Sequence, residues 1–139
     1  MDHVGIVVED LEAAIEFFVA LGLELRGQAS VGGDWVDRAI ALEDVRADIA
    51  MLGTPDGQVR LELSQFHSPA AEGGEPEPSN RLGIRHLSFL VEDLDDVFAR
   101  LRTHGAELVG EIETYRDFYR LCYLRGPAGI IVELAEEVD

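Results

Sequence analysis

Apolar and polar positions near the start of the chain follow two different periods in succession. Residues 3–8 form a short apolar run rich in valine and isoleucine, which is typical of a buried strand. Apolar residues then recur at helical spacing as far as Gly22, and Asp10 precedes them as a helix N-cap would. The pattern therefore predicts a strand followed by an amphipathic helix that ends at Gly22.

Strand-like runs continue through the rest of the first half, over residues 24–31, 35–42, 45–52 and 58–66. The sequence Thr-Pro-Asp-Gly at 54–57 is a strong turn signal between the last two runs. The first half therefore reads as β-α-β-β-β with one additional strand.

The second half repeats the first at an offset of 83 residues. Identical residues occupy nine corresponding positions: His3/His86, Val8/Val91, Glu9/Glu92, Asp10/Asp93, Leu11/Leu94, Gly22/Gly105, Glu24/Glu107, Leu25/Leu108 and Gly27/Gly110. The second copy predicts a strand, a helix and three more strands, over residues 84–91, 93–104, 107–112, 117–125 and 130–135.

A proline-rich segment without apolar periodicity separates the two copies. It holds Pro69, Pro76 and Pro78 and is expected to be a linker. We therefore predict an α+β chain in which residues 1–67 are the first βαβββ module, 68–83 the linker and 84–139 the second module. The two modules are expected to pair as one structural domain.

Charge and composition exclude several classes of function. The net charge of −17, from 28 acidic and 11 basic residues, argues against binding to nucleic acid or to an anionic membrane. All the basic residues are arginines, so a Schiff-base lysine is excluded. Because there is no long apolar run or leader-like start and only one cysteine, we expect a cytoplasmic protein.

Two glutamates interrupt strands that are otherwise apolar, and each copy also places a histidine on its first strand. Glu62 lies within 59–63 and Glu133 within 130–134, where a lone buried carboxylate is costly unless it is paired or bound to a metal. Ion pairs with Arg60, Arg120 or Arg125 are one solution. The other is a divalent ion, because imidazole and carboxylate together suit Ni, Co, Mn, Fe or Zn.

Four motifs carry a resemblance to the vicinal oxygen chelate superfamily: DHVGIVVEDL at 2–11, VRLEL at 59–63, GIRHLSFLV at 83–91 and GPAGIIVEL at 126–134. That superfamily includes glyoxalase I, methylmalonyl-CoA epimerase, extradiol dioxygenases and the fosfomycin and bleomycin resistance proteins. The resemblance implies two βαβββ modules that form an open U-shaped mixed sheet around a central cavity. It also implies a homodimer and a small-molecule substrate.

The resemblance further implies a metal site and a reaction. Its four protein ligands would be His3, Glu62, His86 and Glu133, a set similar to that of glyoxalase I, and Glu62 or Glu133 would act as ligand and base in turn. The expected activity is that of a divalent-metal-dependent lyase or isomerase. Its substrate would be a small carbonyl compound, either a thiol adduct or a thioester, and the reaction would pass through a metal-bound enediolate.

Two alternatives stay open within the same fold. One is an acyl-CoA epimerase like methylmalonyl-CoA epimerase, although that branch usually has glutamine where this chain has Glu62. The other is a metal-free protein that binds small molecules or confers drug resistance. Extradiol dioxygenases use two histidines and one glutamate, so the fourth ligand disfavours them.

The turn at 126–129 suggests how the last two strands pair. A simple pairing places Cys122 across from Glu133, with Arg120 on the same face by alternation. We therefore expect Arg120 and Cys122 to line the substrate cavity, with Arg120 available to anchor a carboxylate or phosphate.

Overall fold

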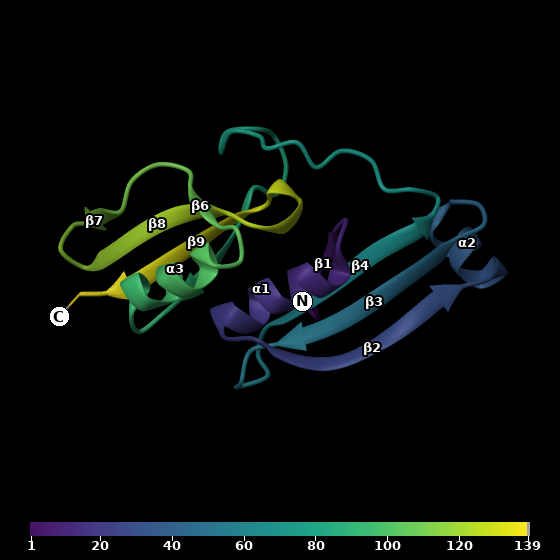
Figure 1. Cartoon of the computed structure of the whole chain (residues 1–139), viewed down its shortest axis with the longest axis horizontal. Coiled ribbons are helices and arrows are strands. Elements are labelled where there is room, and N and C mark those ends of the chain that lie inside the picture. The colour runs from purple at the N-terminus through teal and green to yellow at the C-terminus, as the bar shows by residue number, and fades with distance from the viewer. Residues whose placement is uncertain (139) are drawn as a thin grey trace. The chain divides into compact units, whose positions relative to one another are not determined.

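The computed structural model describes residues 1–138, and the chain divides into two compact units, Met1–Gly73 and Gly74–Asp139 (Figure 1). The division falls inside the segment predicted to be the linker. Each unit contains its own mixed sheet and its own long helix. The expectation of an α+β fold is confirmed.

The first unit follows the predicted order of elements with one exception. Its elements are β1 (Val4–Val7), α1 (Leu11–Leu21), β2 (Glu24–Gly32), α2 (Asp34–Ile40), β3 (Arg46–Gly53) and β4 (Arg60–Ser68). The sheet order is β1-β4-β3-β2, with β1 parallel to β4 and the other pairs antiparallel. Asp10 caps α1 by accepting a hydrogen bond from the Ala13 backbone N–H at 3.0 Å, and Gly22 ends the helix at a φ of 127°.

The exception is the strand predicted over 35–42, which is wrong because most of these residues lie in the helix α2. The apolar residues of this run also fit helical spacing, and only Val36 is buried, whereas Trp35 and Ile40 are exposed. Asp37 then accepts hydrogen bonds from the backbone N–H groups of Asp44 and Val45, at 3.2 and 2.9 Å. Short apolar runs of this kind do not distinguish a helix from a strand, and the local turn chemistry decides.

The second unit repeats the order of the first. Its elements are β5 (His86–Leu90), α3 (Leu94–Arg102), β6 (Glu107–Leu108), β7 (Glu113–Tyr115), β8 (Tyr119–Arg125), the short helix η1 (Pro127–Gly129) and β9 (Ile131–Glu137). The sheet order is β5-β9-β8-β6, with β7 paired to β8. Asp93 caps α3 through the Asp96 backbone N–H at 3.0 Å.

One hairpin in this unit differs from the predicted elements. The strand expected over 107–112 is only two residues long, and β7 forms an additional strand that turns back into β8. Arg116 and Asp117, at φ values of 49° and 58°, make the left-handed turn between them. The run predicted as 117–125 therefore begins as a strand only at Tyr119.

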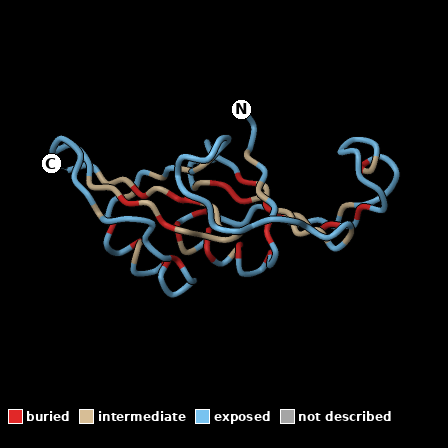
Figure 2. The backbone as a smooth tube through the Cα atoms, turned by 90° about the horizontal axis from the view of Figure 1, so that it is seen from above, coloured by how far each residue is buried: buried red, intermediate tan, exposed pale blue. Residues whose placement is uncertain are grey.

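In both units the long helix covers one face of the sheet and the opposite face carries polar side chains. Phe17 and Phe18 of α1 are buried, as are Leu61 and Leu63 of β4, and Figure 2 shows buried residues on both helix and strands. In the second unit the corresponding core is formed by buried residues of α3, β8 and β9: Leu94, Leu101, Leu124, Val132 and Leu134. Strand alternation then turns Glu62 and Glu133 away from the helices.

Candidate functional site

A histidine and a glutamate meet on the face of the first sheet that the helix does not cover. His3 immediately precedes β1, and Glu62 lies on the neighbouring strand β4, where it is in register with Gly5. His3 Nε2 and Glu62 Oε2 are 3.6 Å apart, and the two side chains are 36% and 30% exposed. Glu62 is thus a half-buried carboxylate that lies beside the His3 imidazole.

The other ring nitrogen of His3 is held by a second carboxylate. His3 Nδ1 lies 2.7 Å from Asp2 Oδ2, and the Arg60 guanidinium donates a hydrogen bond to Asp2 Oδ1. The hydrogen bond with His3, followed by the charge of Arg60, holds the pKa of Asp2 below its ordinary value. His3 therefore lies between Asp2 and Glu62, with one carboxylate beside each nitrogen.

The second unit contains the corresponding pair. His86 begins β5 and Glu133 lies on the neighbouring strand β9, with Nε2 and Oε1 3.5 Å apart. Glu133 is flanked by the fully buried Val132 and Leu134, and its own side chain is 14% exposed. The repeat seen in the sequence therefore places a His–Glu pair at the same position in both units.

Tyr123 completes the second pair and was missed by the sequence reasoning. It lies directly across from Glu133 on β8, and its ring meets the His86 ring edge-to-face at 5.2 Å. Burial, then the negative charge of Glu133 and a hydrogen bond to it, raise the pKa of Tyr123, so the phenol stays protonated and can donate. The corresponding position opposite Glu62 is Met51. Correct register between the last two strands would have revealed Tyr123.

The predicted placement of Arg120 and Cys122 is wrong. Cys122 pairs with Leu134, not with Glu133, because the connection through η1 shifts the register by one residue and so exchanges the two faces. Cys122 is fully buried in the core, and burial raises the pKa of its thiol to about 11. Both residues therefore lie on the face that α3 covers.

The arginines expected as structural partners of the two glutamates bind other groups. Arg60 pairs with Asp2, as described above, and Arg120 pairs with Asp95 at 3.0 Å and Glu136 at 3.6 Å. Arg125 donates hydrogen bonds to the backbone carbonyls of Gly129 and Glu77. The ion-pair explanation for Glu62 and Glu133 is therefore not supported by these contacts.

The imidazole and carboxylate of each His–Glu pair are compatible in chemistry with divalent-metal binding. The N–O separations of 3.6 and 3.5 Å are too long for hydrogen bonds. They lie near the roughly 3.0–3.5 Å expected between two ligands bound to one ion at about 2.1 Å. Within residues 1–138, no group of three or more His, Cys, Asp or Glu side chains is close enough to hold an ion.

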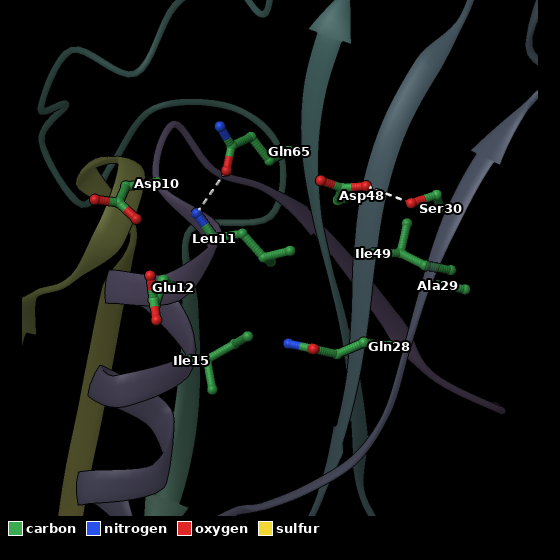
Figure 3. A pocket seen from close by; sticks show the side chains of 10 residues that line it. All are labelled: Asp10, Leu11, Glu12, Ile15, Gln28, Ala29, Ser30, Asp48, Ile49 and Gln65. Atoms are coloured by element: carbon green, nitrogen blue, oxygen red, sulfur yellow. Dashed lines mark hydrogen bonds between the residues drawn. The ribbon is translucent and has the colours of Figure 1, made fainter.

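A separate cavity of about 600 Å³ opens in the first unit, on the other face of the sheet (Figure 3). Its polar lining includes Gln65, whose side-chain oxygen accepts a hydrogen bond from the Leu11 backbone N–H at 2.9 Å, and Asp48, which accepts one from Ser30 at 2.8 Å. None of the residues predicted for the metal or substrate site lines this cavity. It is distinct from the His3–Glu62 pair.

Comparison with known proteins identifies relatives along most of the chain. Residues 2–123 match the profile of a family described as Glyoxalase/Bleomycin resistance protein/Dioxygenase superfamily. The chain is 34% identical to a 2-epi-5-epi-valiolone epimerase from Actinomyces sp., over 95% of this chain and 76% of that protein.

Solved structures support the same relationship. A glyoxalase family protein from Bacillus cereus is 48% identical, with a TM-score of 0.95 over 100% of this chain and 94% of that chain. The trypanothione-dependent glyoxalase I of Leishmania major shares the fold at 21% identity, with a TM-score of 0.67 over 99% of this chain and 86% of that chain. Among the helices of residues 1–138, none is long and apolar enough to cross a membrane.

Proposed function

This chain belongs to the glyoxalase/bleomycin resistance protein/dioxygenase superfamily, which includes enzymes such as glyoxalase I and an epimerase, and from that premise we propose that it is a divalent-metal-dependent lyase or isomerase of the glyoxalase type. Its reaction would be proton transfer at the carbon next to a carbonyl group in a small substrate, either a thiol adduct or a thioester. The observation that carries the proposal is the duplicated His–Glu pair, with N–O separations of 3.6 and 3.5 Å.

Four side chains would hold the ion: His3, Glu62, His86 and Glu133. Each unit contributes one His–Glu pair to this proposed set. Two nitrogen and two carboxylate ligands suit Ni, Co, Mn, Fe or Zn. A bound divalent ion would act as a Lewis acid that polarises the substrate carbonyl.

The two glutamates have different surroundings, which supports different roles for them. Glu133 is the less exposed, and it has the Tyr123 hydroxyl, whose pKa is raised, on the residue directly opposite it. Glu62 is 30% exposed and has the apolar Met51 opposite it. Glu62 is therefore freer to reach a substrate C–H, and it serves as the base that takes up the proton and returns it at the neighbouring carbon.

An epimerase is the second candidate. The 34% identity to 2-epi-5-epi-valiolone epimerase over 95% of this chain favours it. Epimerisation uses the same proton abstraction next to a carbonyl, but it returns the proton to the opposite face of the same carbon. Glu62 and Glu133 would then serve as the two bases, and acyl-CoA compounds are one substrate class to include.

Metal analysis of purified protein tests the proposal first. The native protein, His86→Ala and Glu133→Gln are incubated with Ni, Co, Mn, Fe and Zn, desalted and analysed for bound metal, with His67→Ala as a control away from both pairs. About one ion per complete set of four ligands is expected in the native protein and in the control, with loss in both site variants. A native protein that retains no ion under any condition would contradict the proposal and favour a metal-free binding protein.

The metal-loaded protein is then assayed in D₂O with aldehyde–thiol adducts and with acyl-CoA epimers. Glyoxalase-type activity predicts conversion of the adduct to a thioester. Epimerase activity predicts deuterium incorporation with inversion at one carbon, and it would replace the leading candidate by the second.

A further inference from the structure

His3 has a carboxylate beside each of its ring nitrogens, whereas His86 has one carboxylate and one aromatic ring. Asp2 lies 2.7 Å from His3 Nδ1, and Glu62 lies 3.6 Å from Nε2. Only the first distance is short enough for a hydrogen bond. His3 Nδ1 is therefore engaged in a hydrogen bond with Asp2, whereas Nε2 makes no hydrogen bond with Glu62.

We propose that Asp2 is a positioning residue that fixes His3 in the tautomer protonated at Nδ1, so that the lone pair of Nε2 points toward Glu62 as a metal ligand. The proposal rests on the metal-dependent function proposed above and extends it to a residue outside the four ligands. Proteins use a carboxylate behind a metal-bound histidine to fix the ring orientation and to increase the basicity of the ligand nitrogen.

Arg60 makes this role possible because it holds the Asp2 carboxylate in place. Its guanidinium donates to Asp2 Oδ1 while Oδ2 faces the imidazole. An ionised carboxylate can only accept hydrogen bonds, so a neutral His3 ring must carry its hydrogen on Nδ1. Arg60 and Glu62 are two residues apart on β4 and share one face, so a single strand supplies both the anchor and the second ligand.

The second unit lacks this arrangement. The counterpart of Asp2 is Arg85, which forms an ion pair with Glu77 at 3.6 Å and offers the imidazole no carboxylate. His86 instead meets the ring of Tyr123 edge-to-face at 5.2 Å. The two histidine ligands are therefore held by different means, and the effect of a charge-removing substitution at Asp2 should be confined to His3.

The test compares Asp2→Asn with a matched control, Asp48→Asn. Asp48 also lies beside a histidine, with Oδ2 2.8 Å from His67 Nε2, but that pair is not part of either proposed half-site. Two readouts are used: side-chain ¹H–¹⁵N spectra of the histidines in metal-free protein, which report the tautomer, and the Ni or Zn dissociation constant from competition with a chelator.

We expect native His3 to be protonated at Nδ1, and Asp2→Asn to lose this tautomer and weaken metal binding by about 10–100-fold. Asp48→Asn should alter only the His67 signals. Asp2→Glu, which restores a carboxylate, should recover part of the affinity.

Two results would overturn the inference: a native His3 protonated at Nε2, or an Asp2→Asn protein with the tautomer and metal affinity of the native protein. A native protein that binds no ion is a different result, because it overturns the proposed function. In that case the spectra of the metal-free protein still test whether Asp2 fixes the tautomer of His3, because this tautomer does not depend on a bound ion.

Discussion

Tyr123 and Glu133 lie directly opposite each other in the antiparallel pairing of β8 and β9, so the phenol ring and the carboxylate are cross-strand neighbours. The pKa of Tyr123 is raised by burial and by the charge of Glu133, so the hydroxyl remains a donor across the physiological range. We therefore expect the Tyr123 hydroxyl to donate a hydrogen bond to Glu133 and so to help position this proposed metal ligand.

Tyr123→Phe should weaken metal binding while leaving the fold intact, because it removes the hydroxyl and keeps the ring beside His86. Loss of one hydrogen bond to a ligand carboxylate corresponds to a roughly 10-fold or greater increase in the dissociation constant. Chelator competition measures this change. Tyr115→Phe, which removes a hydroxyl from the exposed hairpin, is the matched control and should bind as tightly as the native protein.

The same tyrosine predicts a dependence of stability on alkaline pH. A pKa raised on folding means that the native state binds the phenol proton more tightly than the unfolded state does. Its contribution is therefore complete below the unfolded pKa of about 10 and decreases as the pH rises through the folded pKa. Urea unfolding between pH 8 and 11 should show a smaller loss for Tyr123→Phe than for the native protein, and equal losses would contradict the pKa shift.

Cys122, like Tyr123, should make the free energy of unfolding decrease at alkaline pH. Its thiol pKa rises from 9.0 to about 11 on folding because the side chain is buried. The free energy of unfolding should therefore fall as the pH increases from about 9 to 11, and Cys122→Ala should lessen that fall. A disulfide reagent at pH 8 should label Cys122 only after denaturation, and rapid labelling of folded protein would argue against burial.

Glu62→Gln tests the assignment of the base. A general base typically contributes about 10²–10⁴-fold to the rate, so kcat should drop by that factor. Bound metal should decrease less in this variant than in Glu133→Gln, since an amide oxygen still offers a ligand and Glu133 is the carboxylate held by Tyr123. If Glu133→Gln were the variant that lost kcat while keeping its metal, the two roles would be exchanged.

The helix-covered cores are predicted to be equally sensitive in both units. Leu63 and Leu134 are fully buried at corresponding positions, and replacing either with alanine should lower the free energy of unfolding by about 2–5 kcal/mol. Leu82→Ala is the control, because Leu82 is 98% exposed and its substitution should change stability by less than about 0.5 kcal/mol. Denaturant titration of the three variants measures both effects.

Sequence reasoning succeeded where side-chain chemistry is local and repeated. Asp10 and Asp93 cap their helices as their type and position indicate, and the repeated His and Glu positions form close pairs. It failed where a shift of one residue in strand register decides which face of the sheet a side chain occupies. Tyr123 and Cys122 are adjacent, but only Tyr123 faces Glu133, and the conformation of η1 that fixes this is not visible in an apolar pattern.

The α2 helix and the Asp2 contact show two further limits. Residues 35–42 suit a helix or a strand equally well by hydrophobic pattern, and hydrogen bonds to Asp37 settle the outcome. The role proposed for Asp2 depends on Arg60, which is distant in sequence and becomes its neighbour only when β1 and β4 pair.

The strand orders place the two proposed ligand types differently within their sheets. β1 and β5 each stand at the end of their own sheet and have one hydrogen-bonded neighbour within it, whereas β4 and β9 have neighbours on both sides. The histidines thus lie in or next to edge strands and the glutamates in interior strands, so we expect β1 and β5 to open more readily than β4 and β9. An ion bound by a histidine and a glutamate of one pair would link the edge strand to the interior strand beside it and so reduce its opening. Slower amide hydrogen exchange in β1 and β5, with little change in β4 and β9, would then report metal occupancy in solution.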